Sequence, residues 1–121
     1  LKPGAAMLIS VPSYLPESLC WIYSKEYMQT PGGHIRIFKK DFLKECFKEL
    51  NLKLFKHHRE HSMHSIYWIL KARNNMKEND FLKSLHALLV KQMFGQAKFS
   101  LFLEKLLNPL FGKSECFYLR K

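Results

Sequence analysis

The predicted fold depends on the stretch KHHREHSMHSIYWILKAR, residues 56–73. An unbroken helix over 57–73 gathers four apolar side chains on one face, and that face must point inward. These side chains are Met63, Ile66, Tyr67 and Leu70. If the helix begins only at Ser62, the residues before it belong to the preceding loop instead.

Histidines occupy a second face of the same predicted helix. They follow one another at helical spacing and run into a tryptophan, about 135° from the centre of the apolar face. This stripe consists of His57, His61, His64 and Trp68, flanked by Lys56, Arg59, Lys71 and Arg73. Imidazole, indole and cationic groups on one outward face offer stacking and phosphate contacts to a nucleic acid. A solvated face without function is the alternative.

Lysines repeat every four residues in the preceding predicted helix, 38–50. Lys40, Lys44 and Lys48 form a basic row suited to phosphate contacts. Asp41 and Glu45 precede Lys44 and Lys48 by three residues, and such pairs also occur on solvated helices. Phosphate binding and a solvated surface therefore both remain open for this row.

Two histidine patterns suggest metal chemistry. His57 and His61 have the i, i+4 spacing at which two imidazoles on a helix reach one ion, with His64 or a residue from elsewhere as the third ligand. Residues 57–61 also spell H-x-x-E-H, the pattern of inverted zinc peptidases. Such a site needs a further carboxylate, for which Glu104 is the distant candidate. Since no cysteine lies nearby and no other catalytic motif occurs, we predict no metal, no cofactor and no enzymatic activity.

Composition indicates one folded domain over 1–121. The chain carries 20 lysines and arginines against 10 acidic residues, for a net charge of +10, and 47% of its residues are hydrophobic. A spread basic excess suits a polyanionic partner, with DNA favoured over RNA, although it also serves solubility. The three separated cysteines favour a reducing intracellular compartment, with the nucleus preferred to the cytoplasm. Because the chain begins at Leu, we expect it to be a domain excised from a longer protein.

Periodicity predicts a mainly α fold with a small β-sheet (α+β). Helices are expected over 16–28, 38–50, 57–73, 80–94 and 98–111. Strands are expected over 34–38 and 115–120, paired with each other, and short strands are also compatible with 5–11 and 50–55. The element order over 16–73 resembles the opening of a winged helix-turn-helix, in which one helix enters the major groove. A compact helical bundle with two or three short strands fits the same pattern.

The apolar spacing also predicts which side chains point inward. On the predicted helices 38–50, 80–94 and 98–111, the inward side chains are Phe42, Leu43, Cys46, Phe47, Leu50, Phe81, Leu82, Leu85, Leu88, Leu89, Phe99, Leu103, Leu106 and Leu110. On 16–28 they are Leu19, Ile22 and Tyr23, and Tyr27 also fits the spacing. Apolar residues outside these faces are candidates for a protein-binding groove or a homodimer face, namely Trp21, Val90, Phe94 and Leu101. No apolar run is long enough to cross a bilayer, so no membrane partner is expected.

Overall fold

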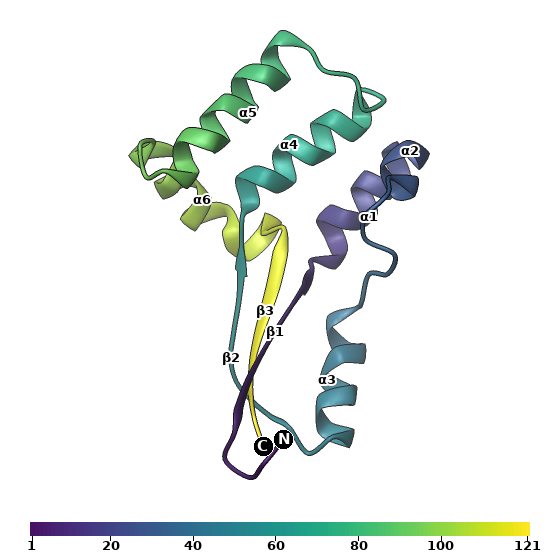
Figure 1. Ribbon diagram of the computed structural model, residues 1–121, viewed down its shortest axis with the longest axis vertical. Coiled ribbons are helices and arrows are strands. Elements are labelled where there is room, and N and C mark those ends of the chain that lie inside the picture. The colour runs from purple at the N-terminus through teal and green to yellow at the C-terminus, as the bar shows by residue number, and fades with distance from the viewer.

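Six helices and a three-stranded antiparallel sheet make up the computed structural model, which describes residues 1–121 (Figure 1). The elements are β1 (Ala6–Pro12), α1 (Tyr14–Tyr23), α2 (Lys25–Gln29), α3 (Lys40–Glu49), β2 (Lys53–Glu60), α4 (Ser62–Arg73), α5 (Asp80–Met93), α6 (Lys98–Phe111) and β3 (Ser114–Arg120). The fold is mainly α with a small sheet, as the sequence predicts.

The last strand of the chain lies in the middle of the sheet. Strand order is β1-β3-β2, and β3 runs antiparallel to both neighbours. Ile9 of β1 and His57 of β2 are both in register with Phe117 of β3. The two outer strands are therefore held together only through β3, and the chain ends lie close to each other (Figure 1).

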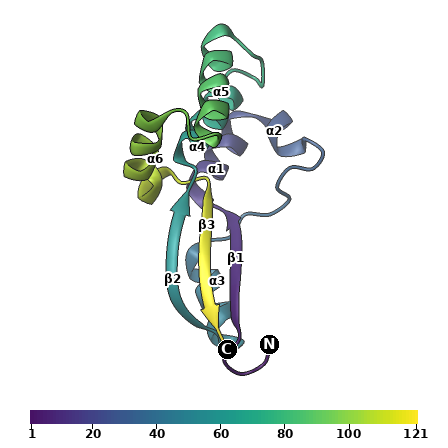
Figure 2. The same cartoon turned by 60° about the vertical axis from the view of Figure 1, so that its left-hand side comes forward.

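One face of the sheet forms a hydrophobic core with α3. Phe117 and Leu119 of β3 are fully buried against Leu43 and Phe47 of α3. The rings of Phe47 and Phe117 meet edge to face, with their centroids 5.4 Å apart. Figure 2 shows α3 on one side of the strands and no helix over the opposite side of their lower part. Side chains that alternate with Phe117 and Leu119 therefore point to an open face.

The other helices gather at the upper end of the sheet (Figure 1). A second core there contains Met63 and Tyr67 of α4 with Leu82 and Leu89 of α5, and Ile66 and Leu70 pack against it. The predicted inward face of residues 63–70 is thus confirmed. Glu17 of α1 is also fully buried, and its carboxylate is bound to Lys113 Nζ at 2.7 Å and His34 Nδ1 at 2.8 Å.

The stretch 56–73 is not one helix. Residues 53–60 form β2, and the helix begins at Ser62. Alternation explains the strand, since Leu54, His57 and Arg59 pair with Leu119, Phe117 and Glu115 on the α3 side. Pairing with β3 therefore overrides the helical spacing of the histidines.

Residues 34–38 contain no strand, which corrects the expected pairing with 115–120. That strand pairs with β1 and β2 instead. Because β2 also separates α3 from α4, the element order on which the winged-helix comparison rests is not found. The first predicted helix is likewise two helices. The helix is interrupted at Ser24. The Ser24 hydroxyl accepts a hydrogen bond from the Tyr27 amide at 3.1 Å and so caps α2.

Helix α6 buries its polar face and exposes its apolar face, the opposite of what the sequence predicts. Its buried residues are Ser100, Glu104 and Asn108, whereas four large apolar side chains on the other face are exposed. These are Phe99, Phe102, Leu106 and Leu110, three of which the sequence places inward. Polar contacts explain the reversal, because Asn108 Oδ1 accepts a hydrogen bond from the Ser62 amide at 3.0 Å. The Asn108 amide also donates to Glu60 Oε2 at 2.7 Å.

Smaller deviations affect the other apolar faces. Phe42, Leu50, Phe81, Ile22 and Tyr23 are exposed although their spacing predicts burial, and Cys46 is half-buried. On α3 only Leu43 and Phe47 are buried, because a single sheet face covers a narrower arc than the apolar stripe. The predicted burial of Leu82 and Leu89 is confirmed.

We expect Phe117→Ala to be the costliest truncation of a phenylalanine. Phe117 is 0% exposed at the centre of the sheet core. Its loss should lower the free energy of unfolding by about 3–5 kcal/mol in urea denaturation. The matched control is Phe102→Ala, at 63% exposure, which should change it by about 0.5 kcal/mol or less. Similar losses in both variants would contradict the placement of the core.

Candidate nucleic-acid interface

The residues of the predicted histidine stripe lie in a strand, in the residue before a helix and in the helix itself. His57 lies in β2, and His61 is the residue before α4, with a left-handed backbone φ of 67°. Only His64 and Trp68 belong to α4 itself. The four side chains therefore do not form one outward row, and the geometric basis of the predicted stripe is wrong.

Trp68 is half-buried and packs against two other aromatic rings. Its ring centroid lies 5.6 Å from that of Tyr27 and 5.3 Å from that of Tyr67. Beside it, Lys71 Nζ is 2.6 Å from Glu78 Oε1, and the hydrogen bond to this carboxylate raises the pKa of Lys71. The indole and its neighbouring cation are thus occupied within the fold.

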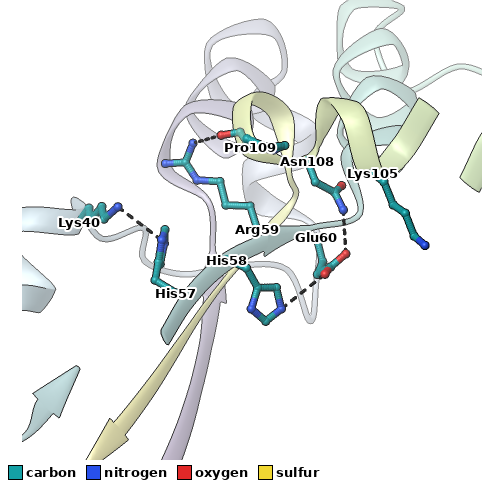
Figure 3. A pocket seen from close by; sticks show the side chains of 8 residues that line it. All are labelled: Lys40, His57, His58, Arg59, Glu60, Lys105, Asn108 and Pro109. Atoms are coloured by element: carbon teal, nitrogen blue, oxygen red, sulfur yellow. Dashed lines mark hydrogen bonds and ion pairs between the residues drawn. The ribbon is translucent and has the colours of Figure 1, made fainter. Parts of the chain in front are cut away.

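Three of the predicted contact residues meet at a different place, an open cleft beside the edge strand β2 (Figure 3). The cleft has a volume of about 530 Å³ and no hydrophobic lining residue other than Pro109. Its lining is Lys40, His57, His58, Arg59, Glu60, Lys105, Asn108 and Pro109. Helix α3, strand β2 and helix α6 thus bring five basic side chains together from segments far apart in the sequence.

A buried carboxylate holds the inner wall of this cleft. Glu115 of β3 is 1% exposed, and its Oε1 lies 2.8 Å from His57 Nε2 and 3.3 Å from Arg59 Nη2. Arg59 also donates through Nη1 to the carbonyl of Pro109 at 3.0 Å. The guanidinium is therefore fixed in position, and its charge is offset by Glu115.

The outer wall is less constrained. His58 Nε2 is 3.5 Å from Glu60 Oε1, and Glu60 also accepts the hydrogen bond from Asn108. Figure 3 shows the Lys105 side chain extending away from the other lining residues. Lys105 is consequently the ammonium of the cleft best placed to meet an incoming anion, and the His58 ring lies beside it on the same wall.

From His58 a row of aromatic and basic side chains continues down the open face of the sheet. The ring of His58 stacks on that of Tyr118, with centroids 5.4 Å apart and an interplanar angle of 29°. Phe55 follows, 6.1 Å from Tyr118 between centroids. Lys56 Nζ lies 5.2 Å from the centre of the Tyr118 ring, and Arg120 Cζ lies 5.3 Å from that of Phe55. We call these five residues the open-face row.

Sequence reasoning missed most of the open-face row. The alternation in 50–55 and 115–120 predicts strands, but not that 53–60 would continue as one strand beside β3. Phe55 reaches this face through an irregularity, since Leu54 pairs with Leu119 and Lys56 with Tyr118, leaving Phe55 unpaired between them. A β-bulge of this kind redirects a side chain. The sequence carries no local signal for it.

The remaining predicted contact residues lie elsewhere. Lys44 and Lys48 are exposed on α3, the helix that covers the other face of the sheet, and Arg73 is exposed at the end of α4. Of the predicted partner-binding residues, Val90 and Phe94 are exposed, whereas Trp21 and Leu101 are half-buried. No helix is both long and apolar enough to span a bilayer.

The H-x-x-E-H pattern does not assemble a peptidase site. In such enzymes a helix brings both histidines to one ion, but His57 and Glu60 lie in β2 and His61 follows it. His57 points to Glu115 and Glu60 to Asn108. Comparison with known proteins adds no assignment, because no family model, curated protein or solved structure matches the chain.

The cleft makes stability depend on pH through His57. Burial lowers the pKa of His57, and Lys40 and Arg59 lower it further, against the opposing hydrogen bond and charge of Glu115. The unfolded chain therefore binds this proton more readily than the folded one. The stability that neutral His57 contributes is full above the ordinary histidine pKa of about 6.5 and is lost as the pH falls below it.

We expect the free energy of unfolding to fall between about pH 7.5 and pH 5.5, and His57→Gln to flatten that fall. Urea denaturation at several pH values measures it. His86→Gln is the control, because His86 is exposed on α5, far in sequence from the cleft. A pH dependence that His57→Gln leaves intact would contradict the role of His57.

Proposed function

We propose that this chain is a non-catalytic module that binds single-stranded nucleic acid along the open-face row of β2 and β3. One observation carries the proposal: two aromatic rings and three basic side chains lie together on a sheet face that no helix covers. A nuclear location and a preference for DNA over RNA stay predictions from charge and cysteine content.

Stacking is the interaction that this surface offers. Phe55 and Tyr118 are adjacent, at an interplanar angle of 57°, so successive bases can stack on different rings. A base inside a duplex has no free face for such contacts, whereas an unpaired base has two. The arrangement therefore favours single strands, in place of the duplex contacts that a helix in the major groove would make.

Phosphate contacts come from lysines and arginine along the same strands. Lys53 is in register with Arg120, and Lys56 with Tyr118, so basic groups line both sides of the rings. Toward the upper end, His58 leads into the cleft with Lys105. Few acidic groups oppose them, since Glu60 is the one carboxylate that lines the cleft.

Phe55→Ala should weaken binding of a single-stranded oligonucleotide by about 1–3 kcal/mol, the value of one stacked base. Lys56→Ala should reduce the slope of log affinity against log salt by about 0.7, as expected for one lost phosphate contact. Fluorescence anisotropy with single-stranded and duplex DNA and RNA at several salt concentrations measures both effects.

Lys44→Ala and Lys48→Ala provide the matched control, because these lysines lie on the helix that covers the opposite sheet face. They should leave affinity and salt slope unchanged. Binding that depends on Lys44 and Lys48 but not on Phe55 would move the site to α3. Equal binding of duplex and single strands would contradict the stacking mechanism.

A second candidate function, protein binding, is favoured by the reversed polarity of α6. Phe99, Phe102, Leu106 and Leu110 form an exposed apolar stripe at spacings of three, four and four residues. Met93 and Phe94 are exposed at the end of α5, shortly before α6 begins. Such a stripe on the outside of a small domain is typical of a surface that receives the apolar face of a partner helix.

Charge indicates what kind of helix would fit. Lys98 and Lys105 flank the stripe, whereas the acidic residue of α6, Glu104, is buried on the other side. Two copies of this chain packed through α6 would bring these lysines together, in addition to a net charge of +10 each. We therefore propose a partner helix with an apolar face and acidic flanks.

A synthetic amphipathic helix with a leucine stripe and glutamate flanks should bind, and the same peptide with lysine flanks should bind much more weakly. Phe102→Ala combined with Leu106→Ala should abolish the binding measured by fluorescence anisotropy. Ile35→Ala is the control, because Ile35 is the most exposed apolar residue and lies outside α6. Equal binding of both peptides, or self-association through α6 in sedimentation, would overturn this assignment of the partner.

A further inference from the structure

Two histidines and a glutamate converge where β2 ends and α4 begins. One ligand atom from each of His61, His64 and Glu104 lies within 4.8 Å of the other two. His61 Nδ1 is 3.9 Å from Glu104 Oε1, and the two imidazole rings meet edge to face with their centroids 5.5 Å apart. The cluster joins α4 to α6 and lies outside the open-face row.

Inside this cluster two polar atoms have no partner. Glu104 is 8% exposed, and its Oε2 is buried without a hydrogen bond. The Nδ1 atom of His64 is also buried and unpartnered. A buried carboxylate oxygen and a buried imidazole nitrogen that lack partners are costly, and a bound cation would satisfy the carboxylate and accept an imidazole as ligand.

The fold holds the three residues in place through their neighbours. The Ser62 amide donates to Asn108 Oδ1 at 3.0 Å, and the Ser62 hydroxyl donates to the Glu104 carbonyl at 3.0 Å. These bonds fix the first turn of α4 against the turn of α6 that carries Glu104. His61 takes the left-handed conformation, which is uncommon for residues other than glycine and turns its ring toward Glu104.

We propose that His61, His64 and Glu104 bind a divalent metal ion of the zinc class. Two imidazoles and one carboxylate are a known zinc ligand set, which leaves a fourth position for water. Ligand atoms about 2.0–2.2 Å from a tetrahedral ion lie closer together than those seen here. The His61 ring is 57% exposed, so it has room to rotate toward the other two ligands.

The surrounding charges permit a cation. Lys113, whose charge helps to lower the pKa of His64, is paired with the buried Glu17 carboxylate at 2.7 Å. The proposed set keeps His61, His64 and Glu104 from the sequence patterns and leaves out His57, and it departs from the sequence-based prediction that the chain binds no metal.

Titration of untagged protein with Zn²⁺ in a calorimeter should give one ion per chain. Glu104→Gln and His61→Ala should each weaken binding by about tenfold or more, in line with the loss of a ligand. Glu104→Gln keeps the size of the side chain, and circular dichroism verifies its fold. Saturating Zn²⁺ should raise the melting temperature of the wild type and leave that of Glu104→Gln unchanged.

Co²⁺ provides an independent signature. Bound at this site, it should show visible d–d absorption without the near-ultraviolet charge-transfer band of a thiolate ligand, which excludes Cys46 and Cys116 as ligands. His86→Ala is the control and should bind the ion as the wild type does. Absence of one-to-one binding, or binding that survives Glu104→Gln but is lost in His86→Ala, would overturn the proposal.

Discussion

The insertion of β3 between β1 and β2 is the constraint on which the rest of the structure depends. The two outer strands lie at opposite ends of the chain's first half and touch only through β3, which the chain forms last. Phe117 and Leu119 of β3 supply the fully buried part of the sheet core. Glu115 of the same strand fixes His57 and Arg59. One strand thus creates the core, the inner wall of the cleft and the open face.

Polar contacts at the start of α4 determine how α6 is oriented. Because Ser62 binds the polar side of α6 through Asn108 and the Glu104 carbonyl, that side faces the domain. The apolar side of α6 must then face outward, and the Glu104 side chain is brought beside His61 and His64. The exposed apolar stripe of α6 and the proposed metal site therefore both follow from the same packing of α6 against α4, and neither includes a residue of the open-face row.

Local periodicity predicts the α+β class, the helices α3, α5 and α6 and the inward face of α4, because each depends on apolar spacing over several turns. Periodicity fails at 57–61, where the spacing of the histidines fits a strand as well as a helix. Pairing with β3, some sixty residues further along the chain, makes this stretch a strand. It also fails on α6, because the spacing shows an apolar face without showing whether the domain or another molecule covers it. Phe55 and Tyr118 were missed for the same reason, since their proximity is set by the register of β2 on β3.

The most direct test of the proposed function is an amide and side-chain NMR titration with a single-stranded oligonucleotide. Shift changes should concentrate on 53–58 and 116–120, with ring-current shifts for Phe55 and Tyr118, and should extend to Lys105 at the cleft. The residues of α3 after Lys40, which itself lines the cleft, should change little. Changes centred on Lys44 and Lys48 of α3, or on Trp68, with an unaffected open-face row would contradict the proposed function.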